Sequence, residues 1–377
     1  MTAFRRLSLV ARHWLRAWHI VGLVALVYIG LTLWRYGGDP IKFALVGSRY
    51  DPGLPGGTWG YDGQFAYQIA RDPLGASRFL DVPAYRYQRI LYPLAARIVA
   101  FGQGALIPWA LIAVNWLALV AGTRFTEEIL AGRGVSHWYA LSYGLFGGLM
   151  MAVRLDLTEP LAYALAQAGI LAYEREPRRV HRAACLLALA ALTKETTLLM
   201  AAGFLSSFAL SRRWRDLVEW AVIIGAPFIA LQALLRVWLG AWGIGSGGAL
   251  ATSFEWIPYR GLWSLAAIDG LAFTLIALVV APMALIPALA ALVAVLRDMV
   301  RGDLHPFVCV LLLNALVIPF TPQSTMREPL GMLRLAVGLV AAVLVWGAYR
   351  RSRRALNYSL LWVATLALAV NESQLPA

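Results

Sequence analysis

The stretch GLAFTLIALVVAPMALIPALAALVAVL, residues 270–296, contains no charged side chain and no histidine. A bilayer core of about 30 Å is crossed by roughly 20 consecutive apolar residues in an α-helix. The stretch is therefore long enough to cross a membrane, and we expect about eleven transmembrane helices in all. The other ten candidate spans lie at about residues 18–34, 105–122, 135–153, 158–173, 183–193, 196–210, 218–239, 305–319, 331–348 and 356–370.

The composition of the whole chain agrees with a lipid environment. Of its 377 residues, 60% are hydrophobic and 14% are charged, which is too apolar for an ordinary soluble domain of this length. We therefore predict an all-α integral membrane protein in which residues 1–377 form one transmembrane domain. The first apolar run continues to Trp34 without a small-residue cleavage site, so we expect a retained helix and not a removable signal peptide.

The distribution of basic residues predicts the orientation, because Lys and Arg resist translocation and collect on the cytoplasmic side. With a cytoplasmic N-terminus, 19 of the 33 Lys and Arg residues fall in cytoplasmic segments. The formal charge of +13 is thus spread over short loops at every second helix end, as membrane insertion and anionic headgroups require. Membrane lipids are the expected partners of this charge, and nucleic acid is excluded.

Two external segments are unusually long. The first runs from about Arg35 to Gly104, far beyond the connections typical between packed helices, and length of that kind usually carries function. Hydrophobic residues recur at helical spacing around 61–69 and 91–99, so we expect two short amphipathic helices lying in the membrane interface. The second segment, from about Gly240 to Asp269, is rich in glycine and is expected to be a mobile flap or a re-entrant loop.

The segment YDGQFAYQIA, residues 61–70, carries a family resemblance together with RILYP, residues 89–93. It resembles the first external loop of the C-type (GT-C) glycosyltransferases. The likeness is to the bacterial branch related to the second mannosyltransferase of GPI-anchor synthesis, and to cell-surface glycopolymer formation proteins with an aromatic-Asp-Gly-Gln-aromatic motif. The resemblance covers about residues 60–95, and Tyr61 stands where several relatives have Trp.

The resemblance implies a GT-C-like fold in a bacterial inner membrane, with the active site at its periplasmic, external face. It also implies a polyprenyl-phosphate sugar donor and an essential acid at Asp62. Chemistry gives independent support, because inverting transfer needs a base for the acceptor hydroxyl, and a partly buried carboxylate near cations can serve. Asp-Gly is equally an ordinary turn signal, so the residues alone leave both interpretations open.

A polyprenyl phosphate leaving group would develop negative charge that Arg or Lys must meet at the bilayer surface. Two of the expected cations share the loop of Asp62, one interrupts the apolar runs near residue 194, and two are seven residues apart and so predicted on one helical face. The candidates are Arg86, Arg89, Lys194, Arg327 and Arg334.

Each of these cations has a structural alternative. Lys194 is followed by Glu195, and the two would neutralise each other as a local pair. Arg327 and Arg334 would snorkel to the membrane interface with their aliphatic stems in lipid. Cys185 and Cys309 fall within apolar runs and are expected to be small buried hydrophobes, so no disulfide or thiolate metal site is predicted.

The acceptor side of the site is predicted from acids and aromatic residues near Asp62. Asp156 and Glu159 precede or begin a helix, where Pro160 suits the first turn and the helix dipole favours acids. The alternative is that one of them faces Asp62 and binds acceptor hydroxyls or a divalent ion, Mg²⁺ or Mn²⁺. Metal binding has no motif behind it, since Asp-x-Asp is missing around Asp62. The full set of acceptor or sugar candidates is Tyr61, Gln64, Asp156, Glu159 and Glu195.

The function expected from the sequence is inverting transfer of a hexosyl or pentosyl group to a glycan or lipid-linked acceptor. The chain ends about seven residues after its last apolar run, which favours an acceptor close to the membrane. One rival is a transporter or flippase of lipid-linked sugars, which should place ionisable groups near the bilayer midplane. A second rival is a non-catalytic subunit of a cell-envelope assembly.

Overall fold

The computed structural model describes residues 15–50, 57–175, 180–268 and 270–370, and within these ranges every regular element is a helix. The expected cytoplasmic N-terminus, residues 1–14, and the pair Arg178 and Arg179 lie outside them. The longer helices are α2 (Ala17–Arg35), α4 (Gly63–Arg71), α6 (Leu91–Val99), α7 (Ile107–Gly132), α9 (Gly147–Arg154), α10 (Glu159–Arg175), α11 (Val180–Thr193), α12 (Leu198–Leu210), α13 (Trp214–Leu239), α15 (Gly270–Val280), α16 (Ile286–Val300), α17 (Pro306–Leu316) and α19 (Pro329–Tyr349).

Short helical turns connect these helices. They are α3 (Ile41–Ala44), η1 (Ala76–Phe79), α5 (Pro83–Tyr87), η2 (Gly104–Leu106), η3 (His137–Ala140), α8 (Leu141–Gly144), η4 (Glu195–Thr197), α14 (Arg260–Ala266), η5 (Ala281–Leu285), η6 (Ile318–Phe320), α18 (Gln323–Met326), α20 (Arg353–Ser359), η7 (Leu360–Thr365) and α21 (Leu366–Val370). The two helices expected in the first long loop are present as α4 and α6, and α5 lies between them.

Five helices of the described chain are long and apolar enough to cross a membrane, which indicates a membrane protein. They are Ala17–Arg35, Gly104–Gly132, Trp214–Leu239, Ile276–Val300 and Pro329–Tyr349. Three shorter apolar helices cover His181–Thr193, Glu195–Leu210 and Pro306–Phe320. The total of about eleven spans stays a prediction.

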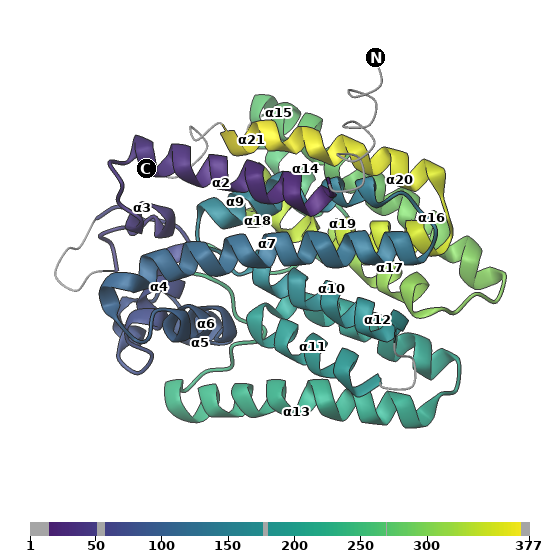
Figure 1. Ribbon diagram of the computed structural model, residues 1–377, viewed down its shortest axis with the longest axis horizontal. Coiled ribbons are helices and arrows are strands. Elements are labelled where there is room, and N and C mark those ends of the chain that lie inside the picture. Colours follow the sequence, from purple (N-terminus) through teal and green to yellow (C-terminus); the bar gives the residue numbers. More distant parts are fainter. Residues whose placement is uncertain (1–14, 51–56, 176–179, 269, 371–377) are drawn as a thin grey trace, which may run out of the picture.

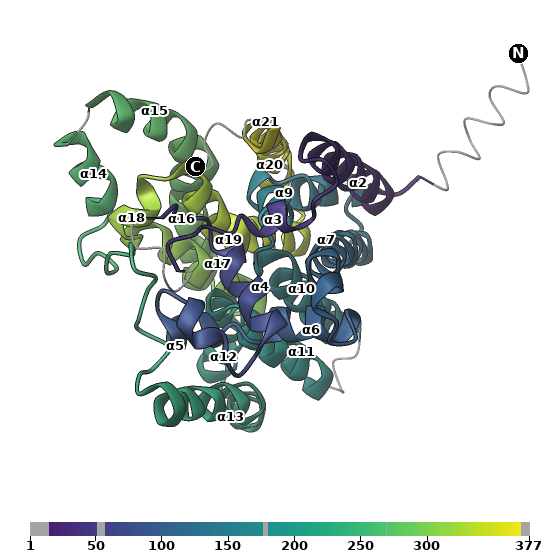
Figure 2. The same ribbon diagram turned by 90° about the vertical axis from the view of Figure 1, so that its left-hand side faces the viewer.

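The long helices run lengthwise through the molecule, and the first long loop gathers at one end of them. Figure 1 shows α2, α7 and α13 along this axis, with α3 to α6 at the end where α7 begins. Figure 2 views the bundle from that end, so α4, α5 and α6 stand in front. In α19, 78% of the most apolar stretch of the helix is buried inside the protein, against 22% in α13. The helix α19 is therefore central and α13 is peripheral.

Two expected spans are broken into short pieces. Residues 135–153 form η3, α8 and α9, and residues 356–370 lie in α20, η7 and α21. The two interrupted segments are hydrogen-bonded to each other: the N–H of Gly147 donates to Thr365 Oγ1 at 2.7 Å. A Cβ on Gly147 would lie 2.5 Å from the carbonyl oxygen of Thr365, so glycine allows this approach. Irregular backbone inside an apolar bundle needs such internal partners.

The predicted interruption near residue 194 is confirmed. α11 ends at Thr193, and Lys194 has an extended backbone, with φ −157° and ψ 124°, before η4 and α12 continue the chain. One expectation about cysteine was wrong: Cys309 is buried, but Cys185 is exposed on α11. Ala183, Ala184 and Leu187 of the same helix are buried, so Cys185 lies on the outward side of α11.

Candidate active site

The backbone around Asp62 explains the position of its carboxylate. Asp62 directly precedes α4 in a helical conformation, φ −56° and ψ −27°, and its side chain makes no capping hydrogen bond to that helix. Gly63 lies so close to the backbone of Leu155 that a Cβ on residue 63 would be 2.0 Å from the carbonyl oxygen of Leu155. Glycine therefore lets the start of α4 press against the connection between α9 and α10, and the carboxylate of Asp62 is left for other partners.

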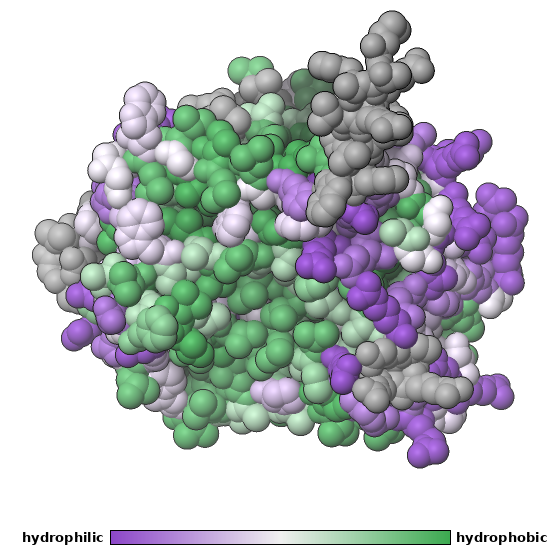
Figure 3. Space-filling view, viewed as in Figure 1, coloured by the Kyte–Doolittle hydropathy of each residue, from purple (hydrophilic) through white to green (hydrophobic). Residues whose placement is uncertain are grey.

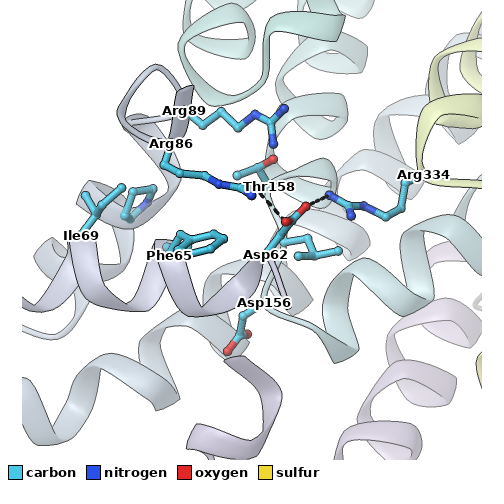
Figure 4. Close-up of a pocket in the computed structure, with 11 residues that line it drawn as sticks. Asp62, Phe65, Ile69, Arg86, Arg89, Asp156, Thr158 and Arg334 are labelled. Atoms are coloured by element: carbon cyan, nitrogen blue, oxygen red, sulfur yellow. Dashed lines mark hydrogen bonds and ion pairs between the residues drawn. The ribbon is translucent and has the colours of Figure 1, made fainter. Parts of the chain in front are cut away.

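Those partners are two guanidinium groups from distant parts of the chain (Figure 4). Arg86 Nη1 lies 3.0 Å from Oδ1 of Asp62, and Arg334 Nη2 lies 2.9 Å from Oδ2. Arg86 comes from α5 in the first long loop, whereas Arg334 comes from the central helix α19. The side chain of Asp62 keeps 30% of its surface exposed, so it is accessible from outside while both oxygens are ion-paired.

Arg86 is fixed from behind by Asp81. Its Nε and Nη2 donate to the two carboxylate oxygens of Asp81 at 2.7 and 2.8 Å, a bidentate pair that only a planar guanidinium can make. The guanidinium also lies 4.1 Å from the ring centroid of Phe65 on α4. Asp81 was not predicted from the sequence. The available signal was an acid just before Pro83, which begins α5 and so brings residues 81 and 86 together across one helical turn.

Arg334 is held in the same way, on the far side of Asp62. Its Nε donates to Oε1 of Glu159 at 2.7 Å, and its Nη1 donates to the hydroxyl of Tyr61 at 3.0 Å. Lys194 Nζ reaches the same Glu159 oxygen at 2.8 Å. Glu159 is fully buried, so one carboxylate at the start of α10 ties the break at Lys194 to the central helix.

A third buried pair completes the cluster. Arg89, between α5 and α6, makes a bidentate contact with Glu195. Its Nε donates to Oε2 at 2.8 Å, and its Nη2 donates to Oε1. Its Nη2 also donates to the hydroxyl of Tyr85 at 2.5 Å. Lys194 and Glu195 thus have different partners, and of the two alternatives for Lys194 the local pair with Glu195 is not formed. The backbone at Lys194 is extended, and Lys194 binds Glu159 while Glu195 binds Arg89.

These contacts define a charge cluster of four carboxylates and four cations. Its members are Asp62, Asp81, Glu159, Glu195, Arg86, Arg89, Lys194 and Arg334. Burial by itself would raise the pKa of Asp62, but Arg86, Arg334 and Arg89 outweigh it and hold that pKa well below its usual range. Burial lowers the pKa of Lys194 to about 8 against the opposing charge of Glu159.

The cluster borders a pocket that is partly open at its mouth, and the empty space of about 360 Å³ there includes solvent outside that mouth. Its walls come from α4, from the α5 and α6 region, from the connection between α9 and α10, and from α19. The lining residues are Asp62, Phe65, Ala66, Ile69, Arg86, Arg89, Pro93, Asp156, Leu157, Thr158 and Arg334. A small pocket with convergent guanidinium groups and one accessible carboxylate suits an anionic group and a hydroxyl.

No family model, curated protein or solved structure matches this chain.

Four of the five predicted cations meet in the cluster, and the fifth does not. Arg327 is exposed and follows α18, whereas Arg334 lies inside α19, which begins only at Pro329. The prediction that the two share one helical face was therefore wrong. A residue before proline is disfavoured in the helical region, and Glu328 accordingly has φ −110° and ψ 111°, so the helix cannot extend back to Arg327.

The acceptor candidates occupy three kinds of position. Glu159 and Glu195 are members of the cluster, and Tyr61 contacts it because its hydroxyl accepts a hydrogen bond from Arg334. Gln64 is 3% exposed, and its amide joins the N–H of Gly47 to the carbonyl of Trp59, so it holds the loop together from behind the site.

Asp156 lines the pocket wall, but its carboxyl group points away from Asp62 (Figure 4). It is fully buried in a left-handed conformation, φ 49°, and neither of its carboxylate oxygens has a hydrogen-bond partner. Burial raises the pKa of Asp156 well above its ordinary value. In the described ranges, no group of three or more His, Cys, Asp or Glu side chains is placed to hold a metal ion.

Proposed function

We propose that this protein is an inverting glycosyltransferase that moves a hexosyl or pentosyl group from a polyprenyl-phosphate donor to a lipid-linked or membrane-close glycan acceptor. The observation that carries the proposal is the position of Asp62. Its carboxylate lies between the guanidinium groups of Arg86 and Arg334, 3.0 and 2.9 Å away, at the mouth of a small pocket. A base and two phosphate-binding cations within one pocket are the groups that such a transfer needs.

The reaction is a single displacement at C1 of the sugar. Asp62 takes the proton of the acceptor hydroxyl as that oxygen forms its bond to C1. The bond from C1 to the phosphate oxygen breaks at the same time, and its electron pair leaves with the polyprenyl phosphate. Arg86 and Arg334 hold the phosphate and meet this charge as it develops. The configuration at C1 is inverted because the acceptor attacks from the face opposite the phosphate.

The fold proposed for this function is a GT-C-like bundle of about eleven transmembrane helices in a bacterial inner membrane. Its N-terminus is cytoplasmic, and the first long loop and the active site face the periplasm. The surface supports this orientation: in Figure 3 the flank of the bundle is apolar, while hydrophilic residues gather at the end where α7 stops and α13 starts. Arg133 and Arg213 flank those helix ends, opposite the first long loop.

The place of the charge cluster within the bundle favours an enzyme over a transporter. Arg334 is the sixth residue of α19, and Lys194 directly follows the last residue of α11, so both lie near helix ends. A transporter of charged lipid-linked sugars is expected to place such groups near the middle of its spans. The same cluster near one membrane face suits a donor whose phosphate stays at headgroup depth.

The test is incubation of the purified protein with a panel of polyprenyl-phosphate sugars and membrane-lipid acceptors, followed by mass spectrometry and assignment of the anomeric configuration. We expect one sugar to be transferred with inversion at C1. Absence of transfer from every polyprenyl-phosphate donor, by protein shown to be folded, would contradict the proposal. Retention of configuration would contradict the single displacement.

A further inference from the structure

We propose that the carboxylate of Asp62 occupies the place of the donor phosphate in the free protein, and that a phosphate-headed lipid displaces it from Arg86 and Arg334. The exchange frees Asp62 to act as the base, so donor binding switches the base on. This inference rests on the proposed function of the site and adds to it an order of events: phosphate first, proton transfer second.

The formal charges of the cluster balance before any ligand binds. The cluster holds four carboxylates and four cations, each in at least one ion pair, and all of these side chains except Asp62 and Glu195 are at least 88% buried. A phosphate brings at least one further negative charge into the same pocket. Buried charges are stable only when each is paired and hydrogen-bonded, so one carboxylate must give up its guanidinium partners.

Exposure and position distinguish Asp62 from the other carboxylates of the cluster. The side chains of Asp81 and Glu159 are 4% and 0% exposed, whereas Asp62 is 30% exposed and lies in the pocket. Asp81 is fixed further by the backbone N–H groups of Val82 and Ala249, at 2.7 and 3.0 Å. Glu195 is 21% exposed, but its bidentate partner is Arg89, and it does not line the pocket. Asp62 is therefore the acid that an incoming anion replaces.

The two guanidinium groups stay in place when Asp62 leaves, because other residues hold them. Asp81 holds Arg86 through two hydrogen bonds, and Glu159 and Tyr61 hold Arg334. Both guanidinium groups thus keep an N–H directed at the pocket without any help from Asp62. A site whose donors are fixed in advance binds an anion without the cost of reorganising them.

The exchange also makes the carboxylate of Asp62 a stronger base. A carboxylate that accepts from two guanidinium groups is a poor proton acceptor, because its charged form is already stabilised. The pKa of Asp62 lies well below its usual range for this reason. Loss of one or both ion pairs to the phosphate raises that pKa and makes the carboxylate a better base at the moment when the donor is in place.

The test measures binding of farnesyl phosphate, a short polyprenyl phosphate without a sugar, to the detergent-solubilised full chain. We expect Asp62→Asn to bind it at least about tenfold more tightly than the wild type, because the competing charge is gone. Asp81→Asn is the matched control, because it also removes one carboxylate charge that is paired with Arg86, but Asp81 does not line the pocket. We expect a smaller gain in farnesyl phosphate affinity from this variant than from Asp62→Asn. Asp62→Ala is the second variant in case the first does not fold.

Farnesol and inorganic phosphate distinguish the parts of the ligand. Farnesol affinity should be the same in wild type and Asp62→Asn, and inorganic phosphate should gain affinity in the variant while binding more weakly than the lipid. Unchanged or weaker binding of farnesyl phosphate by both Asp62 variants would overturn the exchange, as would an equal gain in Asp81→Asn. Because no sugar is present, tighter binding by Asp62→Asn supports the exchange even if the donor panel shows no transfer.

Discussion

Arg334 donates a hydrogen bond to Oδ2 of Asp62 at 2.9 Å across 272 positions of the sequence. The contact joins the first long loop to the central helix α19, and the same guanidinium group also binds Glu159 and Tyr61. Three partners lie around one planar group, so its shape as well as its charge sets the geometry. The position of Asp62 therefore depends on the planar, forked shape of the guanidinium group, and a positive charge of another shape would not be sufficient.

Arg334→Lys should accordingly impair the protein although it keeps the charge. A single ammonium group on a shorter reach cannot contact Glu159, Tyr61 and Asp62 together. We expect the rate of sugar transfer to fall on the order of a hundredfold. Steady-state kinetics on the donor identified by the panel checks this, with Arg327→Lys, an exposed position, as the control. Equal rates for Arg334→Lys and the wild type would show that the fork is not needed.

Gly63→Ala should destabilise the protein through one backbone contact. The added Cβ would lie 2.0 Å from the carbonyl oxygen of Leu155, so α4 must shift away from the connection between α9 and α10. We expect a loss of about 1 to 3 kcal/mol and a lower thermal midpoint, read by tryptophan fluorescence. Gly104→Ala in the same loop is the control, since its Cβ would meet nothing within 4 Å. Equal midpoints for the two variants would contradict the packing at Gly63.

The proton on Lys194 should give an alkaline limb to the pH profile. Burial lowers the pKa of this amine to about 8, Glu159 opposes the shift, and Arg89 and Arg334 add to it. Below about pH 8 the ammonium shares Glu159 with Arg334, and above it Glu159 keeps only Arg334. We expect transfer to slow as the pH rises through about 8, because the stronger pull of Glu159 draws Arg334 away from the donor phosphate that it holds.

The control for this limb is Lys194→Met, whose side chain does not titrate. We expect its transfer rate to be lower than that of the wild type at pH 7 and flat between pH 7 and 9. Rates are compared at saturating donor, so that titration of the free phosphate does not enter the profile. A limb near pH 8 that persists in the methionine variant would assign the titration to another group.

Gln232 should control the opening of the glycine-rich segment after α13. This buried side chain accepts from the N–H groups of Gly243 and Ile244 at 2.9 and 3.0 Å and donates to Gln88 at 3.3 Å. Gln232→Leu leaves two backbone donors unpaired, a cost of about 1 to 3 kcal/mol each when buried. We expect faster hydrogen exchange over residues 241–251 with little change in α19. Exchange that stays at the wild-type rate would mean that Gln232 does not tether this segment.

The sequence predicted the helices better than their partners. The break at Lys194 and the amphipathic spacing of α4 and α6 are local properties, and each produced the expected element. Apolar runs predicted helices, but the runs at 135–153 and 356–370 are broken into short pieces. The pairing of charges is not local. The sequence offered the neighbouring Glu195 as an alternative partner for Lys194, but helix packing brings it Glu159 from 35 positions away.

Proline explains two of the differences. Pro329 begins α19 and separates Arg327 from the helix that carries Arg334, although spacing alone placed the two on one face. Pro83 begins α5 and brings Asp81 back to Arg86, a partner that no periodicity indicates. Of the residues predicted from the motif and from charge, Asp62, Arg86, Arg89, Lys194 and Arg334 lie in one charge cluster, and their roles in transfer stay a prediction. The motif of residues 61–70 supplies Asp62 to that cluster. Its Gln64, in contrast, holds the loop from inside.

The most direct test of the central claim compares single-turnover transfer by Asp62→Asn and by Asp72→Asn, an exposed acid of the same loop. With donor saturating and folding checked by thermal unfolding, we expect Asp62→Asn to lose on the order of a hundredfold or more in rate and Asp72→Asn to match the wild type. Transfer at the wild-type rate by Asp62→Asn would contradict the assignment of Asp62 as the base.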